Sequence, residues 1–170
     1  TISNTLIKEP TPMKITHVLA TVLMASTTVL AACQTTPAPM TPNASVTLPL
    51  SDSKLQHYHW QLTAVTDRAG RPIKPQLFSQ PKPLVVAFEQ GGKVRFANAC
   101  NQMWGNYVLT NDNILVSNIA ATQMLCEPDL MAFEAAAPST LKGQFKLTQD
   151  AHGQPLLTVT DTNQISIFKS

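Results

Sequence analysis

The sequence predicts an α+β domain: a curled antiparallel sheet of about seven or eight strands with one helix packed on it. Three observations support this fold class. Short segments alternate apolar and polar residues, turns rich in Gly, Asn and Asp separate these segments, and one segment has apolar residues at helical spacing. A sheet of this size curls toward a partial barrel, so that the curl and the helix share one core.

The first element that the sequence predicts along the chain is an export signal. Residues 1–12 contain no Met and are expected to precede the true start of the protein. Residues 13–32 have a basic start at Lys14, an apolar middle and small residues at the end, which is the layout of a secretory signal peptide. A transmembrane anchor is the alternative, but the run contains several hydroxyl side chains and barely reaches spanning length.

The end of this run resembles the lipobox of bacterial lipoproteins, with the residues Leu30-Ala31-Ala32-Cys33. In that family the Cys thiol receives a diacylglyceryl group and the chain is cut before the Cys. The resemblance implies a membrane partner, through the lipid anchor on Cys33, and a location in the bacterial cell envelope. The residue after Cys33 is Gln34 and not Asp, which resembles the sorting pattern of lipoproteins that are sent to the outer membrane and face the periplasm. An ordinary cleaved signal peptide with an incidental Cys is the other interpretation.

Residues 33–54 are rich in Pro and Thr and carry no charge before Asp52, which is typical of a semi-extended tether. The folded domain is therefore predicted over residues 55–170. The whole chain of 170 residues has a formal net charge of +2, which predicts no nucleic-acid partner.

The strands are predicted from period-two alternation. Trp60 and Leu62 alternate with polar residues, and Val94 and Phe96 share one face of their strand. Gly91-Gly92 permits the positive φ values of a tight hairpin. The predicted strands cover residues 59–64, 84–88, 93–97, 107–109, 114–116, 144–148, 155–159 and 164–168.

The helix is predicted over residues 128–137. Pro128 suits a first helical turn, Asp129 favours the positive end of the helix dipole, and Pro138 ends or kinks the helix. Three apolar residues share one face of it, Leu130, Phe133 and Ala137.

Residues 100–126, CNQMWGNYVLTNDNILVSNIAATQMLC, resemble the META domain family, which includes heat-inducible lipoproteins of the HslJ type. The family pattern is a Cys-Asn pair, a Gly, an aromatic residue, a hairpin turn and a Thr-x-Met-x-Cys ending. The chain departs from it at Ala99, where many members have Gly, and at Gln123, where many have a basic residue. The residues that match the pattern are Cys100, Asn101, Gly105, Tyr107, Thr122, Met124 and Cys126.

The two cysteines of this motif are expected to form a disulfide. The cell envelope is oxidising, and with Cys33 lipidated the remaining pair is Cys100 and Cys126. Two buried free thiols are the alternative.

Candidate chemistry is sparse. His57 and His59 would share a face of a strand, but a metal site needs a third or fourth ligand, so no metal is predicted. No nucleophile stands in a recognisable catalytic motif, so the sequence predicts neither an enzyme nor a cofactor. Trp104 and Tyr107 frame either a recognition surface or the core, and core packing is favoured.

Two functions remain open. The META resemblance implies a non-enzymatic envelope lipoprotein in stress tolerance or envelope maintenance, with a link to heat or antibiotic stress. The alternative is a binding module with a specific envelope protein as its partner, similar to lysozyme-inhibitor or pilotin lipoproteins.

Overall fold

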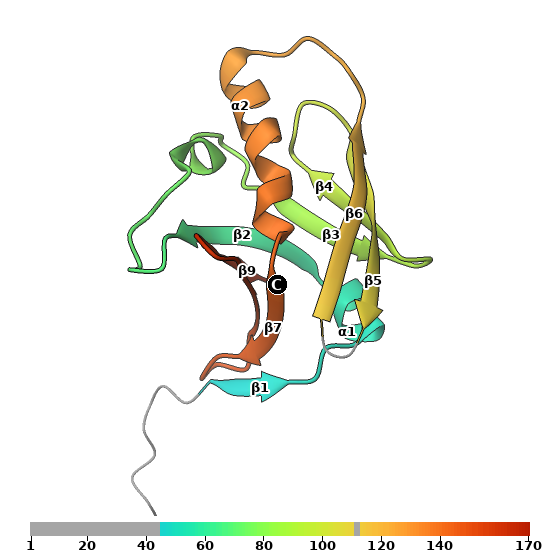
Figure 1. Cartoon of the computed structure of the whole chain (residues 1–170), viewed down its shortest axis with the longest axis vertical. Helices are drawn as coiled ribbons and strands as arrows, with labels where there is room; N and C mark the ends of the chain where they lie inside the picture. Colours follow the sequence, from blue (N-terminus) through green and yellow to red (C-terminus); the bar gives the residue numbers. More distant parts are fainter. Residues whose placement is uncertain (1–44, 111–112) are drawn as a thin grey trace, which may run out of the picture. The chain divides into compact units, whose positions relative to one another are not determined.

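The computed structural model describes residues 45–110 and 113–170. In these residues nine antiparallel strands form one sheet in the order β1-β7-β8-β9-β2-β3-β4-β5-β6 (Figure 1). The sheet is not closed, and β1 and β6 are its two edges. The predicted α+β class is confirmed. The strands are β1 Val46–Leu48, β2 His59–Thr66, β3 Val85–Glu89, β4 Lys93–Ala97, β5 Met103–Thr110, β6 Asn113–Ala121, β7 Gln144–Gln149, β8 Pro155–Thr160 and β9 Ile165–Lys169.

The described helices are few and short. They are α1 Asp52–His57, the 3₁₀ turn η1 Pro75–Phe78, α2 Pro128–Ala136 and the 3₁₀ turn η2 Ala137–Leu141. Figure 1 shows α2 at the opposite end of the curled sheet from β1.

The folded part begins earlier than the sequence predicted. Residues 46–48, assigned to the tether, form β1 and pair with β7, and α1 begins at Asp52 behind the N-cap Ser51. The strand β1 adds to the eight predicted strands, and no alternation indicates it because it has only three residues. Its stability comes from the β7 backbone, about a hundred residues later in the chain.

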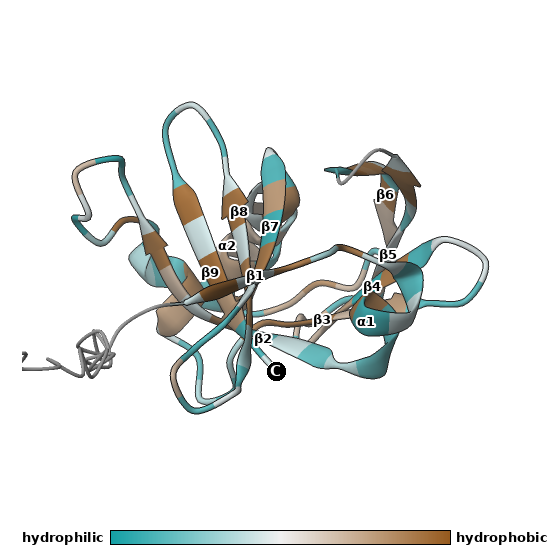
Figure 2. Cartoon of the chain, turned by 90° about the horizontal axis from the view of Figure 1, so that it is seen from below, coloured by the Kyte–Doolittle hydropathy of each residue, from teal (hydrophilic) through white to brown (hydrophobic). Residues whose placement is uncertain are grey.

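Apolar and polar residues alternate along several strands (Figure 2), and this alternation turns one face of such a strand toward the core. Val94 and Phe96 are buried while their neighbours on β4 are exposed, as predicted. On β2 the alternation breaks: the register with β9 shifts between Leu62 and Ala64, and Val65 is buried where a regular strand would bury Ala64. Such a bulge inserts one residue and reverses the inward face beyond it.

Glycine permits the β3–β4 hairpin. Gly91 and Gly92 have φ values of +75° and +69°, which residues with a side chain rarely adopt. A Cβ on Gly92 would also lie 2.7 Å from the carbonyl oxygen of Tyr107. That position therefore needs glycine for both its conformation and its packing.

The helix α2 ends at Ala136, one residue before the predicted end at residue 137. The backbone changes to the 3₁₀ turn η2 at Ala137, one residue before Pro138, which has no N–H to donate to an earlier turn. Phe133 and Ala137 are fully buried and Leu130 is half-buried, so the predicted apolar face meets the core. The largest fully buried side chains of this core are Trp60, Phe133 and Phe168.

Candidate functional site

Asn101 is the centre of the motif in the structure. Its side chain is 4% exposed. The Oδ1 atom accepts hydrogen bonds from Thr122 Oγ1 at 2.9 Å and from the Met124 backbone N–H at 2.7 Å. The Nδ2 group donates to the Met124 carbonyl oxygen at 3.3 Å. Asn101 therefore binds the segment that follows β6 to the start of β5.

Glu134 completes this network from α2. Its two carboxylate oxygens accept from the Asn101 backbone N–H at 2.9 Å and from Asn101 Nδ2 at 3.1 Å. Both amide hydrogens and the carbonyl oxygen of Asn101 thus have partners. No local sequence pattern indicates this role for Glu134, because the contact joins residues 33 apart and depends on how α2 packs.

The disulfide lies beside this network. Cys100 and Cys126 are bonded, with a Cα–Cα distance of 6.4 Å. Thr122 adds a further link: its hydroxyl accepts from the Gln102 N–H at 3.1 Å, and its own N–H donates to the Gln102 carbonyl oxygen at 3.1 Å. The structure therefore brings together five of the seven motif residues, Cys100, Asn101, Thr122, Met124 and Cys126.

Gly105 and Tyr107 lie further along β5 and have separate packing roles. A Cβ on Gly105 would lie 3.0 Å from the Ser117 carbonyl oxygen and 3.1 Å from Ile119 Cγ1. The register of β5 and β6 shifts there, and Asn118 on β6 has a φ of +51°. Glycine allows β6 to bulge close against β5 at this point.

Tyr107 joins β5 to α1. Its ring is 4% exposed and meets Phe88 edge to face at 5.0 Å. Its hydroxyl donates to Asp52 Oδ1 at 3.0 Å and accepts from Gln56 Nε2 at 2.8 Å. Burial raises the pKa of Tyr107, the hydrogen bond and charge of Asp52 raise it further, and the Gln56 hydrogen bond opposes them.

Trp104 corrects the prediction that favoured core packing for both aromatic residues. Tyr107 is buried, but Trp104 is 45% exposed on the outer face of β5. Successive residues of a strand point to opposite faces, so Met103 and Gly105 take the inward positions and Trp104 the outward one.

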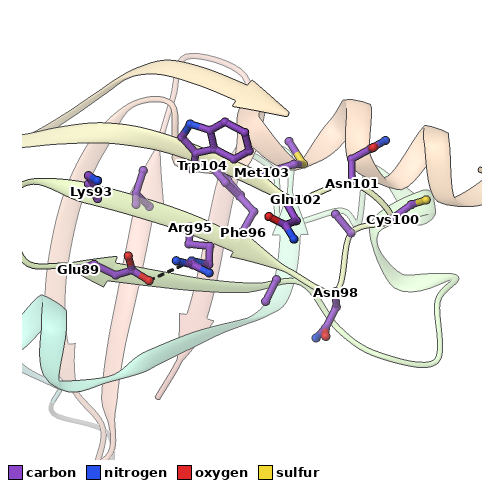
Figure 3. Close-up of a pocket in the computed structure, with 13 residues that line it drawn as sticks. Glu89, Lys93, Arg95, Phe96, Asn98, Cys100, Asn101, Gln102, Met103 and Trp104 are labelled. Carbon is purple, nitrogen blue, oxygen red and sulfur yellow. Dashed lines mark ion pairs between the residues drawn. The ribbon is translucent and has the colours of Figure 1, made fainter. Parts of the chain in front are cut away.

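A surface groove of about 480 Å³ lies along the outer face of β4 and β5 and continues into residues 97–102 (Figure 3). Trp104, Arg95 and Gln102 stand on its floor, with Lys93 and Glu89 toward one end and Asn98 toward the other. Cys100 and Asn101 also line it, so the motif network forms one wall of the groove.

An ion pair orients the charged side chains of this groove. Arg95 Nε lies 3.0 Å from Glu89 Oε1, with the two side chains 64% and 39% exposed. Pairs this exposed contribute about 0–1 kcal/mol to stability. The consequence of this pair is a guanidinium held next to Trp104, since Arg95 and Trp104 are directly opposite each other on β4 and β5.

A second surface feature is apolar. Met124 is 56% exposed, Leu125 99% and Met131 41%, and the three residues border a shallow cavity between the segment after β6 and α2. Exposed apolar side chains that cluster in this way are a recurring sign of a contact surface.

The three histidines of the described residues do not come together in one site. His57 is the last residue of α1 and His59 the first of β2, so they do not share a strand. His152 lies in the β7–β8 turn, where its N–H donates to Asp150 Oδ1 at 2.9 Å. Among residues 45–110 and 113–170, no three His, Cys, Asp or Glu side chains are grouped closely enough to hold a metal ion.

One lysine–serine contact has the composition of a base and a nucleophile. Lys74 Nζ lies 2.5 Å from Ser139 Oγ, and burial lowers the pKa of Lys74 while the charge of Asp161 opposes this shift. The Ser139 hydroxyl, however, donates to the Ala136 carbonyl oxygen at 2.6 Å. Its proton therefore satisfies the end of α2, and Lys74 fixes η1 to that end.

Cys33, the predicted signal peptide and most of the predicted tether lie outside the described residues. No helix in the described part of the chain combines the length and the apolar composition that crossing a membrane requires.

One comparison with known proteins identifies the family. The model of the META domain matches residues 53–170. An NMR structure of a protein from Burkholderia xenovorans has a TM-score of 0.54 and 19% identity, over 74% of this chain and 90% of that chain. A second NMR structure has a TM-score of 0.48 and 22% identity, over 71% of this chain and 94% of that chain. A comparison with curated proteins gives no match.

The first structural likeness supports the fold, and the family model covers the two cysteines, the Asn101 network and all strands from β2 onward. The chain therefore belongs to the META domain family.

Proposed function

We propose that this protein is a lipid-anchored META protein of the bacterial cell envelope that acts by binding, without catalysis, in tolerance of heat or antibiotic stress. The observation that carries the binding role is the groove around Trp104, a large aromatic side chain left 45% exposed among charged and amide groups. Concave sites that combine an apolar surface with a few polar groups are typical of ligand recognition.

The absence of catalysis is supported by how the polar groups are used. The motif network is internally satisfied: the Asn101 amide, Thr122 hydroxyl and Glu134 carboxylate bind one another or the backbone. In the Lys74–Ser139 contact, the serine hydroxyl donates its proton to the Ala136 carbonyl oxygen at the end of α2. A general base must lie within hydrogen-bond reach of the proton that it removes, and these groups are instead bonded to one another or to the backbone.

The envelope address is supported by the lipobox-like residues Leu30 to Cys33 and by Gln34. Growth with an alkyne-labelled fatty acid tests it. The wild-type chain is expected to incorporate the label and to fractionate with the outer membrane, whereas Cys33→Ser is expected to remain unlabelled. Label on Cys33→Ser, or none on the wild type, would contradict the anchor.

The second candidate function is a specific protein-binding module, comparable to lysozyme-inhibitor or pilotin lipoproteins. The observation that favours it is the apolar cluster of Met124, Leu125 and Met131, because a fully exposed Leu beside two exposed Met side chains suits a protein contact. In this alternative the groove would be secondary.

Survival of cells that lack the protein, complemented with variants, separates the two candidates. Trp104→Ala is expected to fail to restore tolerance of heat and of an envelope-targeting antibiotic. Leu125→Ser is expected to restore it, and so is Leu115→Ala, an exposed position on β6 outside the groove. Loss of tolerance with Leu125→Ser alone would favour the protein-binding module. Full tolerance with both Trp104→Ala and Leu125→Ser would contradict both.

A further inference from the structure

Two of the residues that surround Trp104 on the outer face of the sheet are alanines. On one side its cross-strand neighbour is Ala120, on the other it is Arg95, and beyond Arg95 lies Ala87. In the described part of the chain no other ring stacks on the indole; the ring pairs there involve other residues. The indole is 45% exposed, so part of its electron-rich ring is open to a ligand on the sheet surface.

The side chains around the indole provide both donors and acceptors. The ion pair with Glu89 engages Arg95 Nε, and a guanidinium has four further N–H donors. Asn98 Nδ2 donates to the Pro83 carbonyl oxygen at 2.7 Å, which leaves the amide oxygen of Asn98 to accept from a ligand. Gln102 adds an exposed amide two residues from Trp104 on the same face (Figure 3).

This pattern matches a pyranose ring. One face of a pyranose carries C–H groups, whose partial positive charge is attracted to the negative face of an indole, and its rim carries hydroxyls that both donate and accept. Inside the groove, the apolar residues besides Trp104 that reach the surface are Ala97 and Ala99, whereas the exposed Val108 and Leu115 lie further along β5 and β6, outside it. The groove itself therefore offers a protein partner little contiguous apolar area.

The charges of the groove select an acidic ligand. Lys93 and Arg95 face one carboxylate, Glu89, so the groove carries a net positive charge. Two cations are few for a nucleic acid, whose binding depends on many phosphate contacts. They suffice to pair with one or two carboxylates on a small ligand.

From these observations we infer that the groove binds an acidic oligosaccharide, with one pyranose ring stacked on Trp104 and a carboxylate paired with Arg95 or Lys93. The inference rests on the proposed binding function and names its ligand class.

Two tetrasaccharides that differ only in lactyl groups, each of which carries one carboxylate, provide the test. One alternates N-acetylglucosamine with N-acetylmuramic acid, which is the same sugar with a lactyl group. The other is chitotetraose, which is neutral. Each is titrated by calorimetry into the whole chain, purified in mild detergent as cells produce it. The muramyl tetrasaccharide is expected to bind, and to bind about tenfold or more tightly than chitotetraose.

The variants assign the binding to this groove. Trp104→Ala is expected to weaken binding of the muramyl sugar about tenfold or more, and Trp104→Tyr, which retains a flat ring, to recover much of it. Arg95→Gln is expected to weaken binding of the muramyl sugar more than binding of chitotetraose, and so to reduce the preference for the acidic sugar. Lys142→Gln, an exposed lysine outside the groove, is the matched charge control and is expected to change neither.

The fluorescence of the Trp104 indole gives a second measure of binding at this site. Trp60 is fully buried and Trp104 is exposed, so acrylamide is expected to quench mainly Trp104, and the muramyl sugar to protect it. No saturable binding of either sugar at about 10 mM would overturn the inference, because that is weaker than a specific site. Equal binding by Trp104→Ala, or a single-stranded oligonucleotide that displaces the muramyl sugar at lower concentration, would overturn it too. If sugar binding fails while Trp104→Ala still loses stress tolerance in cells, the ligand class is wrong and the proposed binding function stands.

Discussion

At the scale of single residues, Asn101 explains why a Cys-Asn pair and a Thr-x-Met-x-Cys ending occur together in one motif. The asparagine amide provides a donor for Glu134 and an acceptor for Thr122 and Met124 at the same time. Aspartate has no amide hydrogens to donate. The motif is therefore a structural joint between the β5–β6 hairpin and α2.

Asn101→Asp is expected to lower the free energy of unfolding by about 2–4 kcal/mol, because a buried carboxylate would then face Glu134 and the Met124 carbonyl oxygen. Glu134→Gln in the same chain is expected to recover part of this loss. Urea unfolding of the single and double variants measures both. Asn106→Asp, exposed on the same strand, is the control and is expected to change stability by less than about 0.5 kcal/mol. An equal effect at both positions would refute the joint.

Tyr107 makes stability depend on alkaline pH. Burial and Asp52 raise the pKa of Tyr107 in the folded state, whereas tyrosine in the unfolded chain titrates at about 10. Above that pH the unfolded chain loses its proton first. The stabilisation is therefore complete below about pH 10 and is lost as the pH rises toward the folded pKa. Unfolding followed between about pH 8 and 11 is expected to show this decline, with a smaller decline in Tyr107→Phe. Identical pH profiles for the two proteins would contradict it.

At the scale of secondary-structure elements, the sequence predicted strands well where one face is buried and one exposed. β4 is the clearest case, because Val94 and Phe96 alternate with Lys93 and Arg95. β5 has apolar residues in both alternating sets, Met103 and Tyr107 inward and Trp104 and Val108 outward. Alternation cannot decide between two such sets, so Trp104 was assigned to the core. The contact of Asn101 with Glu134 depends on the docking of α2, which no local pattern encodes.

The disulfide joins the segment before β5 covalently to the segment before α2. It closes a loop with a sequence separation of 26 residues. Chain-entropy estimates predict that Cys100→Ser with Cys126→Ser lowers the free energy of unfolding by about 3.5 kcal/mol. Urea unfolding of the double variant measures this loss, and reducing agent is expected to affect the wild type but not the variant. Unchanged stability of the double variant would show that the Asn101 network alone holds the joint.

At the scale of the whole molecule, the open sheet depends on its edges. β1 is three residues long and covers the edge of β7. Its sequence resembles the tether before it, which is why composition placed the domain boundary too late. A short strand of this kind protects the backbone N–H and C=O groups of its neighbour from pairing with other chains.

Deletion of residues 45–50 is expected to destabilise the domain by about 1–2 kcal/mol, since it removes the β1–β7 hydrogen bonds. It is also expected to promote association through the uncovered β7 edge. Thermal unfolding and light scattering measure the two effects. Thr47→Ala, which keeps the backbone of β1, is the control. A deletion variant as stable and as monomeric as the wild type would show that β1 contributes nothing to the fold.

We propose a division of roles within the domain: the motif around Asn101 stabilises the fold, and the groove around Trp104 binds the ligand. The most direct test measures unfolding free energy and affinity for the muramyl tetrasaccharide in the same two variants. Trp104→Ala is expected to change stability by less than about 1 kcal/mol and to lose about tenfold or more in affinity. Thr122→Val, which removes a hydroxyl bonded to Asn101 at a position outside the groove, is expected to lose stability, while its folded fraction retains wild-type affinity. If Trp104→Ala unfolds the domain, or Thr122→Val abolishes binding while folded, the division is contradicted.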